Sequence, residues 1–170
     1  METNFQAKVD EIKALFYNWM NRNLTVYGKI LVVKSLALSK LSHLSLVLPN
    51  LAKDQIKQLE TLIFKFLWNG KPDKISREHS KLKEKAGGLG VPDIKTFWNG
   101  LKFSWFKRMI STEAFWPKIL QLEVQDILGH DFQTEDFLQL GPLKYKSLSK
   151  KINNDFCSQV FATVDAGGNI

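Results

Sequence analysis

Cysteine is nearly absent from this chain of 170 residues, since Cys157 is the only one. A disulfide within one chain is therefore excluded, and so is a zinc cluster held by several thiolates. The three histidines, His43, His79 and His130, are far apart and have no cysteine or histidine at ligand spacing. The sequence predicts neither a metal centre nor a cofactor.

Adjacent aspartates, and any other constellation typical of catalysis, are also missing. Two-metal polymerase chemistry needs paired carboxylates, yet no Asp-Asp occurs, and the nearest acidic pair, Glu135-Asp136, is interpreted as a surface helix start. Nothing suggests a serine activated by an oriented histidine. We expect this chain alone not to be an enzyme and to have no small-molecule substrate.

Targeting and membrane signals are equally scarce. Met1–Asn4 has neither a basic nor an apolar leader pattern. The apolar stretch Ile30–Leu51 contains Lys34, Lys40 and His43, which makes it a poor membrane span. The expectation is an intracellular protein, cytoplasmic or nuclear, without a membrane partner.

Hydrophobic and basic residues are abundant. Hydrophobic residues make up 44% of the chain and aromatic residues 12%, which is enough for a folded core. The formal net charge is +7 and the pI is about 9.4, which favours an anionic partner. Residues 51–110 hold 13 basic and 6 acidic side chains, whereas residues 111–170 have a net charge of −3. The positive charge is thus concentrated in the middle of the chain.

Hydrophobic periodicity predicts an all-α fold, an irregular bundle of five to seven helices with at most a short extended segment. Apolar residues recur every three or four positions in the first helix, which we expect to begin with a capping box at Thr3 and Gln6. Further helices are expected at about 24–48, 53–68, 93–110, 113–123, 134–138 and 147–161. The helix expected at about 93–110 should bury a stripe of Phe97, Leu101, Trp105 and Met109.

A glycine-rich turn separates the basic stretch from the helix that follows. Two adjacent glycines indicate either a positive backbone φ or the close approach of another segment. A phosphate-binding loop is the competing interpretation, but the Gly-Lys-Ser/Thr ending is absent. We therefore predict a structural turn with a helix cap at its end, formed by Gly87, Gly88, Gly90, Pro92 and Asp93.

The basic residues are the best functional signal. Lysine and arginine neutralise phosphates, which gives affinity without sequence readout, and an aromatic ring between them can stack on a base. A solvated lysine-rich surface is the simpler alternative. Trp98, which lies off the predicted core stripe, is the stacking candidate. The predicted nucleic-acid-binding residues are Lys29, Lys34, Lys71, Lys74, Arg77, Lys81, Lys83, Lys85, Lys95, Trp98, Lys102, Lys107 and Arg108.

Several motifs follow one another in a recognisable order. A helix end, Phe66–Lys71 (Phe-Leu-Trp-Asn-Gly-Lys), precedes the double-glycine stretch Lys83–Asp93 and the aromatic segment Asn99–Trp105. Upstream, Leu24–Ile30 (Leu-Thr-Val-Tyr-Gly-Lys-Ile) precedes a Lys-Ser helix at Val33–Leu41. Over about residues 5–123 this order resembles the thumb and post-thumb region of reverse transcriptases from non-LTR (LINE-type) retrotransposons. Lys29 stands where that family usually has arginine.

The resemblance implies a fragment of an RNA-directed DNA polymerase that lacks the palm domain. Residues 1–50 would be a thumb-like helical part and residues 51–123 a basic, aromatic post-thumb region, followed by a helical tail at 124–170. The fragment would grip the backbone of template–primer or target RNA and DNA. A second hypothesis is a helical protein-interaction module that docks on the missing palm domain or another partner.

Overall fold

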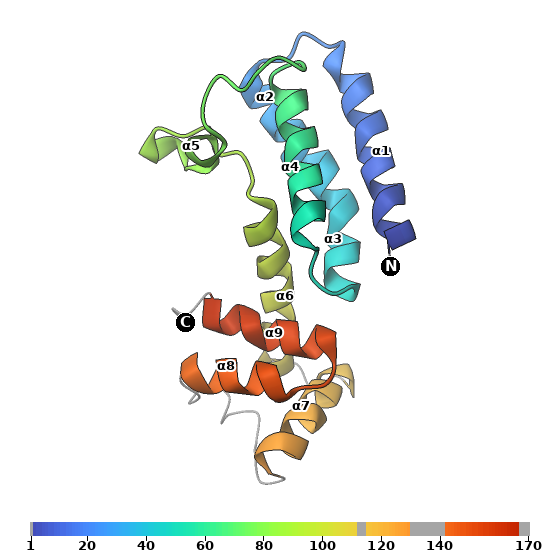
Figure 1. Ribbon diagram of the computed structural model, residues 1–170, viewed down its shortest axis with the longest axis vertical. Coiled ribbons are helices and arrows are strands. Elements are labelled where there is room, and N and C mark those ends of the chain that lie inside the picture. Colours follow the sequence, from blue (N-terminus) through green and yellow to red (C-terminus); the bar gives the residue numbers. More distant parts are fainter. Residues whose placement is uncertain (1, 112–114, 130–141, 167–170) are drawn as a thin grey trace. The chain divides into compact units, whose positions relative to one another are not determined.

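All regular structure in the described part of the chain is helical. The computed structural model describes residues 2–111, 115–129 and 142–166, and no strand occurs in them (Figure 1). The all-α prediction is confirmed, although short separate helices raise the number above the five to seven expected. The helices are α1 (Glu2–Met20), α2 (Val26–Val32), a π-helical turn (Val33–Ala37), α3 (Leu38–Val47), α4 (Lys53–Leu67), α5 (Arg77–Lys81), a 3₁₀ turn (Glu84–Ala86), α6 (Ile94–Ser111), α7 (Phe115–Leu128), α8 (Pro142–Lys151) and α9 (Asp155–Ala166).

The chain divides into two compact units. Unit 1 comprises residues 1–44 and 51–97, and unit 2 comprises residues 45–50 and 98–170. The division differs from the predicted parts, because most of 1–50 and the first half of 51–123 share one unit. The short segment 45–50 packs with residues 98–170, although residues 51–97 of unit 1 lie between them in the sequence. Each unit is described separately below.

In unit 1, α1 packs its apolar stripe against α4. Phe5, Val9, Ile12 and Phe16 are buried, as their three-and-four spacing predicts. The ring of Phe16 stacks on Phe66 of α4, with 4.3 Å between ring centroids and 3° between ring planes. The predicted capping box at the start of α1 is wrong, because the helix already begins at Glu2.

One continuous helix runs through α2, the π turn and α3. Its start is capped by Thr25, whose hydroxyl oxygen accepts a hydrogen bond from the Gly28 N–H at 3.2 Å. Among the described residues this helix, Val26–Val47, is long and apolar enough to cross a membrane, and 44% of its most apolar stretch is buried within the protein. Length and composition of this kind are also found in core helices.

Helix α6 buries a different stripe from the predicted one. Ile94, Trp98 and Phe106 are buried at four- and eight-residue spacing, whereas Phe97, Leu101 and Trp105 are only partly covered. The side chain of Met109, the fourth member of the predicted stripe, lies outside the described residues. The helix is apolar on several sides, so the sequence pattern alone does not single out the buried one.

In unit 2, the predicted helix at 147–161 is in fact two helices, α8 and α9. Helix α8 ends at Lys151. Asn154 caps the start of α9, because its side-chain oxygen accepts hydrogen bonds from the N–H groups of Phe156 (3.0 Å) and Cys157 (3.2 Å). The C-terminal end, expected to fray from Asp165, is helical to Ala166. The helix expected at 134–138 lies outside the described residues.

The two C-terminal helices close the core of unit 2. Side chains from α6, α7, α8 and α9 form one buried cluster, and the ring of Phe106 makes edge contacts with Tyr145 and Phe161 at 5.6 and 6.1 Å. Cys157 is a free, buried thiol in this cluster. The cluster consists of Phe106, Val124, Tyr145, Leu148, Ile152, Cys157, Val160, Phe161 and Val164.

Candidate nucleic-acid interface

The glycine turn of unit 1 is closed by its own hydrogen bonds. Every backbone N–H from Ala86 to Val91 donates to a carbonyl, and Ser80 O accepts two of them, from Leu89 at 3.3 Å and from Val91 at 3.0 Å. Gly87 (φ +77°) and Gly90 (φ +66°) adopt the left-handed conformation. With its N–H groups all used, the turn has no donors left to hold a phosphate, so the structural interpretation of this motif is supported.

Gly88 is required by close approach and not by its φ angle. A Cβ atom at this position would lie 2.1 Å from the carbonyl oxygen of Leu82 and 2.5 Å from its carbonyl carbon. Both atoms belong to the backbone, so they cannot turn aside as a flexible side chain would. Of the two alternatives that the sequence left open, close approach applies to Gly88 and positive φ to Gly87 and Gly90.

Asp93 caps α6, as predicted. Its carboxylate accepts hydrogen bonds from the Thr96 N–H at 2.9 Å and from the Thr96 hydroxyl at 2.6 Å. Burial acts to raise the pKa of Asp93, but the hydrogen bonds from Thr96 and Lys81 outweigh it and hold the pKa below its ordinary value. The carboxylate is therefore charged at neutral pH and stabilises the start of the helix.

Lys81 joins three elements of unit 1 and is not free for a phosphate. Its ammonium group lies 2.8 Å from Glu60 of α4, 3.1 Å from Glu78 of α5 and 3.1 Å from the capping Asp93. Burial by itself would lower the pKa of Lys81, but the hydrogen bonds to these carboxylates raise it above its ordinary value. The prediction that Lys81 binds nucleic acid is not supported, because three carboxylates already neutralise its charge.

Lys29 is buried at the C-terminal end of α4, so its predicted phosphate contact is wrong. Its side chain is 3% exposed, and its ammonium group donates to the carbonyl of Phe66 at 3.0 Å, to that of Leu67 at 3.4 Å and to the side-chain oxygen of Asn69. The last carbonyls of a helix have no partner within the helix, and a cation there is stabilising. Burial lowers the pKa of Lys29.

Lys102 and Trp98 are buried in unit 2 and are corrected in the same way. Lys102 is 0% exposed, donates to the Leu48 carbonyl and lies 3.7 Å above the ring of Phe156. Trp98 is 2% exposed, and its indole N–H has no acceptor among the described residues. Neither side chain is open to a phosphate or a base. The apolar spacing of α6 predicted a different buried stripe, so Trp98 and Lys102 were expected to be exposed.

Burial of Lys102 predicts a rise in stability with pH. Loss of hydration lowers the Lys102 pKa from 10.5 to about 8, with a smaller opposing effect from Cys157. Because the folded pKa is the lower one, the unfolded chain holds more protons above pH 8, and the free energy of unfolding increases with pH. Between pH 7 and 9 we expect a gain of about 1 kcal/mol.

Urea unfolding of the parent and of Lys102→Met at several pH values below 9 tests this expectation. The methionine variant should lack the rise. The range stops at pH 9 because burial raises the Cys157 pKa from 9.0 to about 11, so the stability contribution of that thiol is lost with increasing pH above 9. A parent and a variant with parallel pH profiles would contradict the role of Lys102.

Six of the predicted lysines of unit 1 are exposed and have no ion pair among the described residues. They lie on the π turn, on the loop after α4, on the segment before the glycine turn and on the first turn of α6. Arg77 differs from them, because it is ion-paired with Asp73 at 2.8 Å and lies over the ring of Phe64. The six are Lys34, Lys71, Lys74, Lys83, Lys85 and Lys95.

The glycine turn keeps part of this set together. Lys83 and Lys85 immediately precede it, and the ammonium group of Lys34 would lie 3.6 Å from a Cβ atom at Gly90. A cation from the first helical region thus reaches the turn that follows the basic stretch. Lys34 was predicted as a binding residue, but its proximity to the glycine turn was not visible in the sequence.

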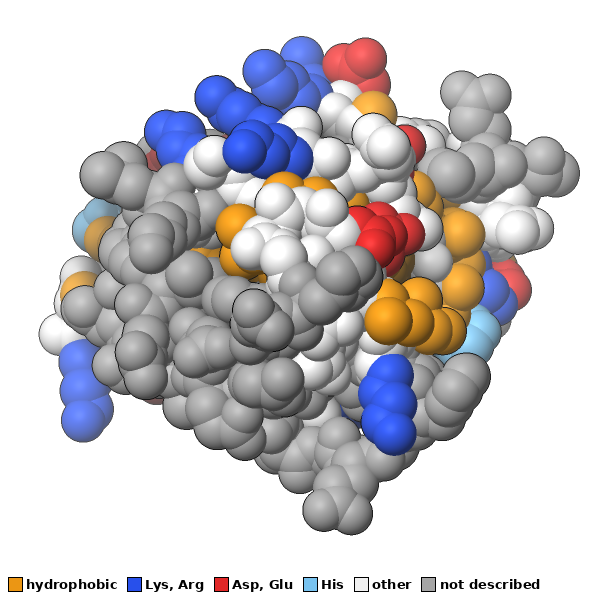
Figure 2. Space-filling view, turned by 90° about the horizontal axis from the view of Figure 1, so that it is seen from below, with side chains coloured by type: hydrophobic (Ala, Val, Ile, Leu, Met, Phe, Trp, Pro, Cys, Tyr) orange, Lys and Arg blue, Asp and Glu red, His pale blue; other side chains and the backbone are white. Residues whose placement is uncertain are grey.

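Unit 2 contributes further exposed cations. Lys107 and Arg108 are exposed near the end of α6, and Lys107 lies over the Phe103 ring at 5.6 Å. Figure 2 shows lysine and arginine side chains gathered at one edge of the face it presents. The exposed cations of α8 were not among the predicted binding residues, and their spacing places them on the outer side of a helix that buries Tyr145 and Leu148. They are Lys146, Lys150 and Lys151.

The histidines in the described part of the chain do not form a metal site. His43 is exposed, and His79 is in hydrogen-bond contact with the Gly87 carbonyl at 3.1 Å. Among the described residues, no three histidine, cysteine, aspartate or glutamate side chains are placed to hold a metal ion. His130 and the Glu135-Asp136 pair lie outside the described residues.

Comparison with known protein families assigns no family to the chain. No family model matches it. The resemblance to non-LTR reverse transcriptases therefore stays a prediction from the motifs.

Proposed function

We propose that this all-α chain is a non-catalytic nucleic-acid-binding module of the kind found next to the polymerase palm in non-LTR reverse transcriptases. It would grip the backbone of RNA or DNA without reading the sequence. The observation that carries the proposal is that six of the predicted lysines of unit 1 are exposed and have no ion pair among the described residues. Such lysines are free to neutralise phosphates and release counterions.

The contacts that fix the lysine-bearing segment support this proposal. Lys81 ties α5 to α4 and to the start of α6, and the glycine turn is closed by backbone hydrogen bonds. Lys83 and Lys85 are therefore presented on a short, tied segment and not on a free tail. A positioned set of cations loses less conformational entropy on binding than a mobile one.

Binding should depend strongly on salt. If the chain contacts about four to six phosphates of duplex DNA, log K should fall against log salt with a slope of roughly −4 to −5. Fluorescence anisotropy with labelled single-stranded RNA and duplex DNA, between about 50 and 200 mM salt, measures this slope. Sequences of different composition should bind with similar affinity, since no groove-reading element is apparent.

A matched pair of variants separates local contacts from net charge. Lys83→Ala with Lys85→Ala removes two unpaired lysines and should make the slope shallower by about 2. Lys8→Ala with Lys40→Ala removes the same charge, but both of these lysines are paired with Glu11, so the effect should be smaller. Affinity that does not change with salt, or no binding at low salt, would refute the proposed function.

A further inference from the structure

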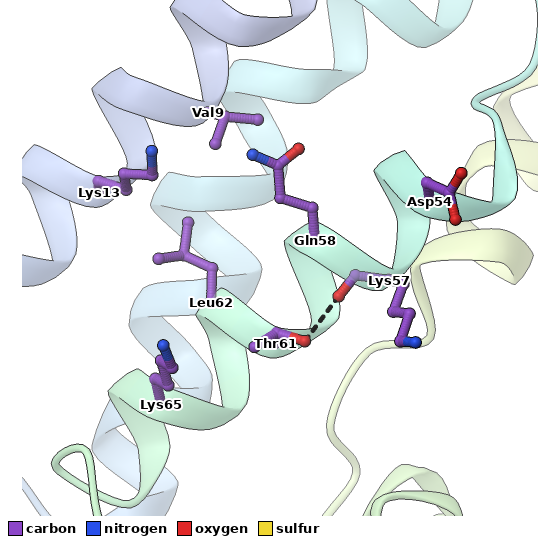
Figure 3. Close-up of a pocket in the computed structure, with 8 residues that line it drawn as sticks. All are labelled: Val9, Lys13, Asp54, Lys57, Gln58, Thr61, Leu62 and Lys65. Atoms are coloured by element: carbon purple, nitrogen blue, oxygen red, sulfur yellow. Dashed lines mark hydrogen bonds between the residues drawn. The ribbon is translucent and has the colours of Figure 1, made fainter.

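A groove runs between α1 and α4 in unit 1, outside the lysines assigned above. Its volume is about 390 Å³. Figure 3 shows Gln58 and Leu62 of α4 pointing toward the space beside Val9 and Lys13 of α1. The groove is lined by Val9, Lys13, Asp54, Lys57, Gln58, Thr61, Leu62 and Lys65.

Positive charge dominates the walls of this groove. Lys13 is ion-paired with Asp10 at 2.8 Å, whereas Lys57 and Lys65 are exposed and have no ion pair in the part of the chain that the structure describes. Asp54 is the one carboxylate in the lining, and it lies in the first turn of α4. The two unpaired lysines are eight residues apart, which corresponds to about 12 Å along the helix axis.

The remaining lining defines what kind of anion fits. Leu62 provides partly exposed aliphatic surface, whereas Val9 is buried, and the groove has no aromatic side chain on which a nucleobase could stack. The Thr61 hydroxyl already donates to the Lys57 carbonyl at 2.8 Å, so the Gln58 amide is the neutral group left to hydrogen-bond a ligand. Aliphatic surface with flanking ammonium groups suits a chain of carboxylates and aliphatic side chains better than a nucleic acid.

We propose that the α1–α4 groove is a docking site for an acidic, aliphatic helical segment of another protein. A leucine, isoleucine or valine of the segment packs on Leu62. Two carboxylates, separated by two helical turns, meet Lys57 and Lys65, because the same spacing along a helix matches the distance between these lysines. The charges set the orientation of the segment, and the aliphatic contact excludes water.

Selection from a displayed library of short random peptides against the whole chain tests the proposal. Peptides that contain both acidic and aliphatic residues should be enriched, and their affinity should fall by about tenfold or more for Lys57→Glu with Lys65→Glu. Lys57→Gln with Lys65→Gln should give a smaller loss. Lys57 and Lys65 are exposed, so each variant is expected to fold, and circular dichroism checks this.

The control variant, Lys83→Ala with Lys85→Ala, should bind the selected peptides like the parent. This result separates the groove from the proposed nucleic-acid surface, so either proposal can fail without the other. Four outcomes overturn the proposal: no enrichment, enriched peptides without acidic residues, equal binding to parent and Lys57→Glu with Lys65→Glu, and displacement of the peptides by a short single-stranded RNA. The last outcome would assign the groove to nucleic acid.

Discussion

Gly88→Ala is expected to lower the free energy of unfolding by about 3 kcal/mol, near the upper end of the usual cost of overpacking. The added Cβ would lie 2.1 Å from the Leu82 carbonyl oxygen, so one of two backbone segments must move. The same displacement should weaken RNA binding at low salt without removing a charge, because Lys83 and Lys85 precede the glycine turn. Denaturant unfolding and fluorescence anisotropy measure the two effects.

Gly100→Ala is the matched control for this substitution. Gly100 lies within α6, and an added Cβ would have no atom within 4 Å among those compared. Alanine there should leave stability unchanged or raise it by up to about 1 kcal/mol, because glycine is unfavourable inside a helix. If Gly88→Ala and Gly100→Ala unfolded at the same denaturant concentration, the close approach to Leu82 would have no structural role.

Lys29→Met should lower the free energy of unfolding by about 2 kcal/mol at neutral pH. Methionine keeps the apolar volume of the stem but leaves the carbonyls of Phe66 and Leu67 without their donor at the end of α4. Removing a buried cation recovers part of this cost, since burial already lowers the Lys29 pKa. The lost hydrogen bonds should outweigh that gain. Urea unfolding gives the difference directly.

Lys34→Met, five residues along the same continuous helix, distinguishes a structural lysine from a binding one. Lys34 is exposed, so its replacement should change stability by less than about 0.5 kcal/mol while reducing nucleic-acid affinity. Lys29→Met should lower stability and, when affinity is measured on folded protein, leave nucleic-acid binding unchanged. A stable Lys29→Met variant with weakened RNA binding would restore the original assignment of Lys29 to the interface.

Local patterns in the sequence predict the helices well where one apolar stripe is unambiguous. The first helix is an example, because Phe5, Val9, Ile12 and Phe16 form one stripe on an otherwise polar surface. In α6 the pattern fails, since Phe97 and Trp98 begin two equally apolar stripes and only the neighbouring elements decide which is buried. The break before α9 was missed for a similar reason, because an asparagine at position 154 could either continue a helix or cap the next one.

The candidate site was predictable in composition but not in detail. Lysines that remain exposed and lysines that are buried look alike in the sequence. Lys29 bonds to a helix end 37 residues away and Lys102 to a carbonyl 54 residues away, and no local pattern reports such distant partners. The α1–α4 groove was missed for a similar reason, because its lysines belong to two helices that are far apart in the chain.

The path of the chain between its two units limits how the protein can be shortened. It passes from one unit to the other at 44/45, 50/51 and 97/98. The inserted segment supplies the Leu48 carbonyl that accepts from Lys102, and the Asn50 N–H that donates to Gln159 at 2.6 Å. Cutting the gene at any single codon would therefore leave one half with a missing piece. A fragment that is to contain all of unit 2 must therefore include residues 45–50 as well as 98–170.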